Sequence, residues 1–203
     1  KIFEIPASAK EKAWIDNDTY LKMYQESVED PEGFWDKQAD RLDWFKKWDR
    51  TLDWDYNKAY IRWYEGGKLN VSHNCLDRHL EARGDQKALI WESDDPNVDR
   101  SFTYKQLHSE VSRFANVMKA LGVVKGDRVM IYMPMIPELA IACLACARIG
   151  AVHSVVFGGF SSEALKNRII DCDGKMLISA NAGVRGGKSV PLKQNADAAM
   201  EGT

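Results

Sequence analysis

Short apolar runs recur along the chain from about residue 73 onward, separated by amphipathic stretches. Brief runs rich in β-branched and other apolar side chains, bounded by turn residues, predict strands. Such runs stand at 87–92 ("KALIWE"), 128–133 ("RVMIYM"), 151–157 ("AVHSVVF") and 175–179 ("KMLIS"). We expect the 151–157 strand to be buried and "DDPNVDRS" (94–101) to form a turn, because Pro and Asn favour turn geometry.

Helical periodicity is clearest in "TYKQLHSEVSRFANVMKALG" at 103–122. Thr103 and Gln106 have the spacing of a capping box, and Gly122 is a suitable stop. The expected core face consists of Leu107, Val111, Phe114, Met118 and Leu121. Further helices are predicted around 137–148 and in "SSEALKNRIID".

The alternation of these elements defines the fold class. Strands that alternate with helices at short spacing form a mostly parallel sheet with right-handed crossovers. Strands that are apolar nearly throughout require helices on both faces of the sheet. The sequence therefore predicts an α/β domain, part of which lies in residues 73–203.

Residues 1–72 differ in composition, since they hold six of the seven tryptophans. Asp30 is a suitable cap and Pro31 a suitable first residue for a helix. Its expected apolar stripe consists of Phe34, Gln38, Leu42 and Phe45. Large aromatic side chains on a short helix favour an extension that packs on a larger core. A carbohydrate or ligand platform is the alternative.

Composition narrows the function classes. The 203 residues contain 28 Lys and Arg against 30 Asp and Glu, a formal net charge of −2. This balance gives no reason to expect a nucleic-acid or membrane surface, although the tryptophans leave base stacking as an alternative. No apolar run approaches the roughly 18 residues of a membrane span. The start of the chain also lacks the apolar core of a signal peptide.

The cysteines and histidines offer little candidate chemistry. Cys75, Cys143, Cys146 and Cys172 have no disulfide-framework spacing, which favours the reducing cytoplasm. Cys143 and Cys146 stand in an apolar helix, so we expect them to be small packing residues and not a metal or redox pair. We expect His153, in a predicted strand, to be a core histidine. The sequence supplies no catalytic and no metal-binding residue.

One loop has the chemistry of a phosphate site. "AGVRGGKS" at 182–189 differs from the triphosphate-binding loop only in having Ala182 for the first glycine. However, Pro191 interrupts the helix that should begin at Lys188. Arg185 and Lys188 beside two glycines still form an anion trap. A nucleotide-binding domain built on 182–189 is therefore one alternative.

A second glycine-containing loop follows the predicted 151–157 strand. In "FGGFSSEAL" (157–165), Gly158 and Gly159 allow a ligand to approach the backbone closely. Ser161 or Ser162 is placed to cap the next helix, whose N-terminus favours an anion. A tight turn without a ligand is the alternative.

Several stretches together resemble the N-terminal part of AMP-forming acetyl-CoA synthetases, in the acyl-adenylate-forming superfamily. They are "SVEDPEGFWDKQA", "GGKLNVSHNCLDRHLEARGDQKALIWE", "KGDRVMIYMPMIPELAIACLACARIGAVHSVVFGGFSSEAL" and "GVRGGK". The resemblance implies a ligase that joins acetate and ATP into acetyl-adenylate and pyrophosphate, then transfers the acetyl group to CoA. It also implies that residues 73–203 are the first part of the family's large N-terminal domain.

The same resemblance implies a CoA site. By similarity, its residues are Arg185, Gly186, Gly187 and Lys188, together with Gly158 and Gly159 along the pantetheine path. The family often has Arg where Lys188 stands and Asp where Asn181 stands. The near match to a triphosphate loop then reflects shared chemistry, because both sites need glycines and cations.

The resemblance also implies which sites are elsewhere. The family's ATP-phosphate loop, its AMP and Mg²⁺ motif, its acetate pocket and its catalytic lysine would all lie beyond Thr203. We therefore expect these residues to be part of a longer chain and inactive alone, with acetate, ATP, CoA and the remainder of the chain as partners. A propionyl-CoA or other short-chain synthetase is an alternative, as is a non-catalytic scaffold.

Overall fold

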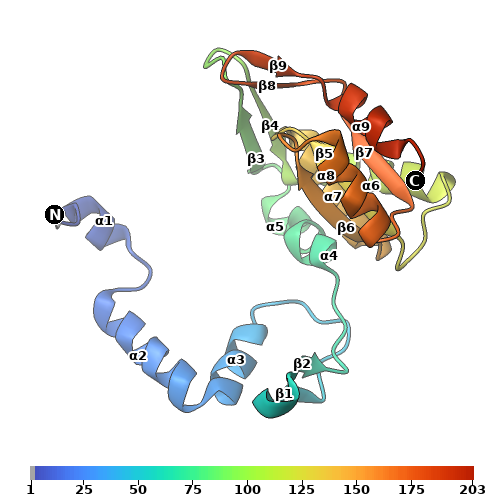
Figure 1. The fold of residues 1–203 in the computed structure, drawn as a ribbon. Helices are drawn as coiled ribbons and strands as arrows, with labels where there is room; N and C mark the ends of the chain where they lie inside the picture. Colours follow the sequence, from blue (N-terminus) through green and yellow to red (C-terminus); the bar gives the residue numbers. More distant parts are fainter. Residues whose placement is uncertain (1–2) are drawn as a thin grey trace. The chain divides into compact units, whose positions relative to one another are not determined.

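The computed structural model describes residues 3–203, and the chain divides into two compact units between residues 69 and 70 (Figure 1). Helix α4 (Val71–Cys75) thus belongs to the second unit. The packing of residues 1–72 onto the α/β core stays a prediction, and residues 1 and 2 lie outside the described part of the chain.

The first unit consists of short helices followed by a β-hairpin. Its elements are α1 (Ala7–Lys12), α2 (Asn17–Glu29), α3 (Pro31–Ala39), β1 (Arg50–Asp55), η1 (Tyr56–Lys58) and β2 (Tyr60–Glu65). Asp30 caps α3 as predicted, because its carboxylate accepts a hydrogen bond from the Gly33 N–H at 3.0 Å. Strands β1 and β2 pair antiparallel, with Leu52 opposite Trp63.

The predicted apolar stripe on α3 is wrong beyond its first turns. The helix ends at Ala39, whose carbonyl accepts hydrogen bonds from the Leu42 N–H at 3.0 Å and the Trp44 indole N–H at 2.9 Å. These bonds satisfy the helix terminus and turn the chain away. Phe34 is buried, but Leu42 and Phe45 are 45% and 64% exposed.

The second unit is the α/β part. It begins with α4, η2 (Asp77–His79), α5 (Leu80–Arg83), β3 (Lys87–Glu92), β4 (Asp99–Thr103) and α6 (Tyr104–Ala120). It continues with β5 (Arg128–Met133), α7 (Pro137–Ile149), β6 (Val152–Phe157), α8 (Ser162–Asp171) and β7 (Met176–Ser179). It ends with β8 (Gly183–Arg185), β9 (Lys188–Val190) and α9 (Leu192–Met200).

A parallel sheet in the order β6–β5–β7 is the centre of this unit. Val129 of β5 pairs with His153 of β6 on one side and with Met176 of β7 on the other. Alternate side chains of a strand point to opposite faces. Ile131 therefore packs with the cluster that includes α6 and α7, whereas Tyr132 packs with the cluster that includes α8 and α9. Helices lie on both faces (Figure 1), and the predicted fold class is confirmed.

Helix α6 shows how the sequence determines an element. The predicted capping box is present, because Thr103 accepts from the Gln106 N–H and the Gln106 side chain accepts from the Thr103 N–H. Leu107, Val111 and Met118 are buried as expected. Leu121 is exposed instead, because the helix ends at Ala120.

Two predictions about strands are wrong. Strand β6 lies at an edge of the described sheet, so most of its side chains, His153 among them, are exposed and not in the core. The stretch 94–101 is not a turn throughout, because Asp99–Thr103 forms β4 and pairs antiparallel with β3. Its polar side chains are compatible with a strand whose face is open to water.

Within residues 3–203, no helix combines the length and the apolar character that crossing a bilayer requires.

Candidate functional site

The phosphate-like loop is a β-hairpin. Strands β8 and β9 pair antiparallel, with Arg185 directly opposite Lys188. Gly186 and Gly187 form the two-residue turn with φ of +57° and +73°. Hairpin turns of this kind need positive φ at both central positions, which glycine adopts without steric cost. The turn is exposed, and nothing lies within 4 Å of where a side chain would begin on either glycine.

The hairpin does not favour the triphosphate-loop alternative. In such a loop, the Lys and the Ser or Thr open a helix whose N–H groups hold the phosphates. Here Lys188 and Ser189 lie in strand β9, and the next helix begins at Leu192, after Pro191.

The structure brings this hairpin together with the second glycine loop. The Arg185 guanidinium lies over the Phe157 ring, 5.1 Å from its centroid. A Cβ atom at position 159 would lie 2.6 Å from Cε1 of Phe157 and 3.3 Å from Nη1 of Arg185. A larger residue at 159 would force the Phe157 ring or the Arg185 side chain to shift, so Gly159 and Arg185 belong to one local cluster.

Gly158 has a packing role that the sequence did not indicate. A Cβ atom there would lie 3.3 Å from the Met133 carbonyl oxygen and 3.4 Å from Cδ2 of Leu192. A side chain at 158 would thus crowd the end of β5 and the start of α9. These contacts account for the glycine without invoking a ligand.

Three side chains that sequence reasoning missed shape the 158–160 loop. Tyr132 reaches the loop from β5, and its hydroxyl lies 2.8 Å from the Phe160 carbonyl oxygen and 3.2 Å from that of Gly158. Asn195 of α9 donates to the same hydroxyl at 3.2 Å. Arg168 of α8 lies over the Phe160 ring, 4.8 Å from its centroid. The sequence signal for this contact is Tyr132 itself, a polar side chain within the otherwise apolar run at 129–133.

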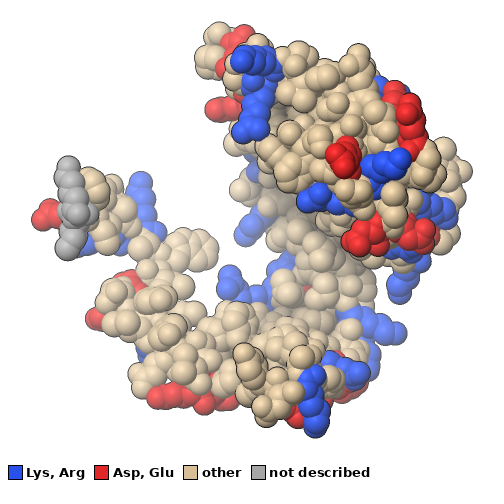
Figure 2. Space-filling view, in the orientation of Figure 1, with Lys and Arg blue, Asp and Glu red and all other residues tan. Residues whose placement is uncertain are grey.

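The cluster carries uncompensated positive charge. Within the part of the chain that the structure describes, neither Arg185 nor Lys188 forms an ion pair with a carboxylate, and both are exposed. Elsewhere on the face in Figure 2, basic and acidic side chains are interspersed over the α/β unit. The hairpin and the loop after β6 therefore suit an anionic ligand.

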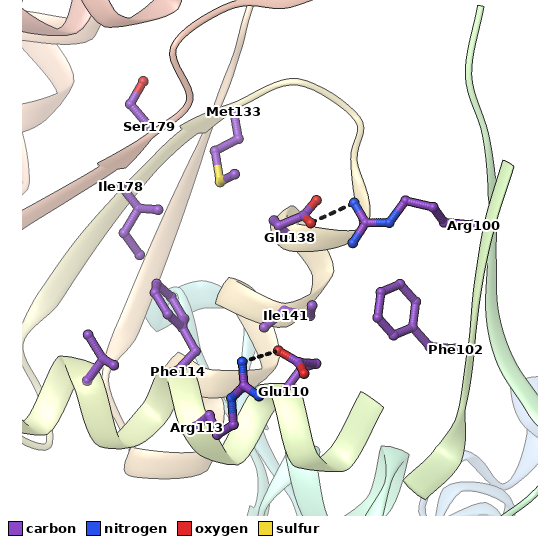
Figure 3. Close-up of a pocket in the computed structure, with 11 residues that line it drawn as sticks. Arg100, Phe102, Glu110, Arg113, Phe114, Met133, Glu138, Ile141, Ile178 and Ser179 are labelled. Atoms are coloured by element: carbon purple, nitrogen blue, oxygen red, sulfur yellow. Dashed lines mark hydrogen bonds and ion pairs between the residues drawn. The ribbon is translucent and has the colours of Figure 1, made fainter. Parts of the chain in front are cut away.

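A separate pocket of about 550 Å³ lies among β4, α6, α7 and the ends of β5 and β7 (Figure 3). Phe114, Ile141 and Ile178 supply apolar walls. Arg100 pairs with Glu138 at 2.7 Å, and Arg113 pairs with Glu110 at 3.3 Å. None of the predicted CoA-site residues lines this pocket.

The interpretation of Cys143 and Cys146 as packing residues is confirmed, since both belong to the apolar cluster around α6 and α7. All four are free, and Cys146 is fully buried. Burial, together with the neighbouring Cys143, raises the pKa of the Cys146 thiol to about 11, so the thiol stays protonated. Among residues 3–203, no group of three or more His, Cys, Asp or Glu side chains is arranged to share a metal ion.

Comparison with known proteins shows the family of the chain. Residues 76–201 match the model of the AMP-binding enzymes, so the chain belongs to the AMP-binding enzyme family. Residues 20–75 match the N-terminus of acetyl-coenzyme A synthetase.

Individual relatives agree with these matches. The chain is 61% identical to an acetyl-coenzyme A synthetase of Syntrophus aciditrophicus over 98% of its residues, and 61% identical to one of Alkalilimnicola ehrlichii over 99%. It is 57% identical to one of Halorhodospira halophila over 100%. The chain spans only about 31% of the length of these relatives.

Proposed function

We propose that this chain is the N-terminal segment of an AMP-forming acetate–CoA ligase, which makes acetyl-CoA from acetate, ATP and CoA through acetyl-adenylate. The similarity to acetyl-CoA synthetases over nearly the whole chain supports the reaction. The structural observation that supports a CoA site is the environment of Arg185. Its side chain is exposed, forms no ion pair with a described carboxylate and lies beside Gly159.

The CoA site in this proposal comprises Arg185, Gly186, Gly187, Lys188, Gly158 and Gly159. The planar Arg185 guanidinium suits both stacking on adenine and paired hydrogen bonds to a phosphate, whereas Lys188 acts as a point charge. The exposed turn between them leaves room for a phosphate group to approach. The nucleotide end of CoA, an adenine with phosphates, has the chemistry that this cluster recognises.

The ATP, acetate and Mg²⁺ sites belong, in this proposal, to segments of the relatives that this chain does not match. The chain itself contributes no catalytic residue and is inactive alone. Four free cysteines fit a reducing compartment such as the cytoplasm. We propose acetate and not propionate as the substrate, because the relatives are named acetyl-coenzyme A synthetases.

The test uses a chimera: the full-length Syntrophus aciditrophicus relative with these 203 residues in place of its matching segment. Arg185→Ala should raise the KM for CoA about 10- to 100-fold, since a hydrogen bond to a charged group contributes about 1.5–3 kcal/mol. Lys188→Ala should have a smaller effect of the same kind. Acetate-dependent pyrophosphate–ATP exchange, which needs no CoA, should be unchanged.

Lys119→Ala, at an exposed position on α6, is the matched control. It should change neither the KM for CoA nor the rate of pyrophosphate–ATP exchange. An unchanged KM for CoA in Arg185→Ala would contradict the proposed site. A raised KM for ATP in Lys188→Ala would instead support the nucleotide-loop alternative.

A further inference from the structure

Tyr132 is a buried polar residue in the middle strand of the sheet. Its side chain is completely buried among the residues that α8 and α9 contribute to the core. Most of β5 is apolar, so a phenylalanine would satisfy packing at this position. The hydroxyl must therefore be explained by what it contacts.

The contacts lie on the loop between β6 and α8. The hydroxyl oxygen is 2.8 Å from the Phe160 carbonyl oxygen and 3.2 Å from the Gly158 carbonyl oxygen. It accepts a hydrogen bond from the Asn195 amide at 3.2 Å. A hydroxyl has one proton and two lone pairs. Asn195 occupies a lone pair, which directs the proton toward the two carbonyls.

Fixing these carbonyls also fixes two N–H groups. The C=O and the N–H of a trans peptide point in opposite directions, and none of the described peptide bonds is cis. With the Gly158 and Phe160 carbonyls held toward Tyr132, the N–H groups of Gly159 and Ser161 point away from it. Within residues 3–203, neither N–H donates a hydrogen bond to another residue.

The two N–H groups belong to the loop that Arg185 contacts. The Arg185 guanidinium lies beside Gly159, and both residues are exposed. Gly159 thus lies beside a guanidinium, and the Ser161 N–H belongs to the same loop two residues further along. Free backbone donors near a cation suit the oxygens of an anionic or amide-containing ligand.

We propose that Tyr132, oriented by Asn195, is a positioning residue for CoA binding: it holds the Gly158 and Phe160 carbonyls inward and so presents the Gly159 and Ser161 N–H groups to the ligand. This inference rests on the proposed function. It adds to that function a residue that does not touch CoA but sets the geometry of the groups that do.

The test uses Tyr132→Phe in the chimera, because this change keeps the ring and removes only the hydroxyl. The KM for CoA should rise about tenfold, equal to about 1.4 kcal/mol. The kcat at saturating CoA should stay within about twofold, as should acetate-dependent pyrophosphate–ATP exchange. Asn195→Ala should raise the KM for CoA about threefold, since the hydroxyl then keeps its bonds but loses its orienting partner.

Two controls separate positioning from general stability. Ile169→Val removes a methylene from the same buried cluster without touching the 158–160 loop, so it should lower the melting temperature and leave the KM for CoA unchanged. Tyr104→Phe removes a hydroxyl at the start of α6, away from the 158–160 loop, and should also leave the KM for CoA unchanged. If Tyr132→Phe fails to fold, Asn195→Ala becomes the test: a raised KM for CoA supports the positioning role, and an unchanged KM refutes it.

Arg185→Ala, measured in parallel, distinguishes the two possible failures. If it raises the KM for CoA and neither Tyr132→Phe nor Asn195→Ala does, the positioning role is refuted while the CoA site stands. If none of the three raises it, the proposed CoA site itself fails. If Tyr132→Phe reduces pyrophosphate exchange as much as it weakens CoA binding, the residue is merely structural and the inference is overturned.

Discussion

Residues 3–69 and residues 70–203 bury their apolar side chains in different ways. In the second unit, a parallel sheet lies between two layers of helices, and the side chains of Val129 through Tyr132 are fully buried. In the first unit, Phe34, Ala39 and Leu52 are the buried hydrophobic residues among those described, and large rings such as Trp14 and Trp54 are exposed.

The first unit relies instead on ring contacts and indole hydrogen bonds. The Trp44 and Trp48 rings meet edge-on, with centroids 4.8 Å apart. The Trp48 N–H lies 2.7 Å from the Thr51 hydroxyl and 2.8 Å from an Asp36 carboxylate oxygen. Such directional contacts order the chain locally, but they bury little area. Good helix caps and large aromatic residues therefore do not by themselves make a core.

The largest expected difference between the units is in the cost of truncating leucine. Leu165→Ala should lower the free energy of unfolding by about 2–5 kcal/mol, because Leu165 is completely buried in α8 and the change leaves a cavity. Leu21→Ala, at a position 53% exposed in α2, should cost less than about 1 kcal/mol. Urea denaturation of both variants measures this, and equal costs would refute the contrast.

A smaller effect is expected at a half-buried ion pair in the second unit. Arg148 of α7 holds both carboxylate oxygens of Asp77, at 2.7 and 2.8 Å, and each side chain is 26% exposed. Arg148→Ala should cost about 1–3 kcal/mol at pH 7, since it leaves the carboxylate without its main partner. Lys193→Ala, which breaks the exposed pair with Asp197, is the control and should cost under about 1 kcal/mol.

The same pair should make stability depend on pH. The hydrogen bonds from Arg148 hold the pKa of the Asp77 carboxyl below its usual value, against the opposing effect of burial. A depressed folded-state pKa stabilises the protein above the unfolded value of about 4 and loses that contribution as pH falls below it. Urea denaturation from pH 7 to pH 3 should show a smaller loss of stability in Arg148→Ala. An identical pH profile would contradict this explanation.

The smallest effect concerns the hydrogen bonds of the first unit. The buried Thr51 hydroxyl donates to Asp36 at 2.7 Å and accepts from the Trp48 indole. Thr51→Val keeps the shape and removes both bonds. It should cost only about 1 kcal/mol, because the Trp48 indole and the Asp36 carboxylate still bond each other at 2.8 Å. Tryptophan fluorescence during urea denaturation measures this loss in the free energy of unfolding. No loss of stability would mean that the indole network does not hold this unit together.

Periodic segments with a local start signal were predictable from the sequence. The capping box at Thr103 placed α6 correctly, and Asp30 with Pro31 placed the start of α3. The α9 helix was missed although Leu192, Ala196 and Ala199 recur at helical spacing and are buried. The β8–β9 hairpin was missed although Gly-Gly between two short runs is a hairpin signal. Both elements therefore carry a local signal in the sequence.

Other features depend on tertiary contacts that no local pattern encodes. The apolar run 151–157 predicts a buried strand, but its place at an edge of the described sheet leaves His153 exposed. The residue patterns point to Arg185 and Gly159 in two separate loops, and only the family resemblance assigns both to one CoA site. Their contact is a property of the fold. The role of Tyr132 required the structure as well, because the carbonyls it meets lie 26 and 28 positions further along the chain.

In the proposed function, the hairpin and the loop after β6 form one CoA-binding surface. Hydrogen–deuterium exchange of the chimera tests it most directly. Added CoA should slow exchange in both 157–161 and 183–190, whereas ATP with Mg²⁺ should leave the two segments unchanged. Protection of 183–190 by ATP with Mg²⁺, or protection of neither segment by CoA, would mean that these two segments do not form a CoA site.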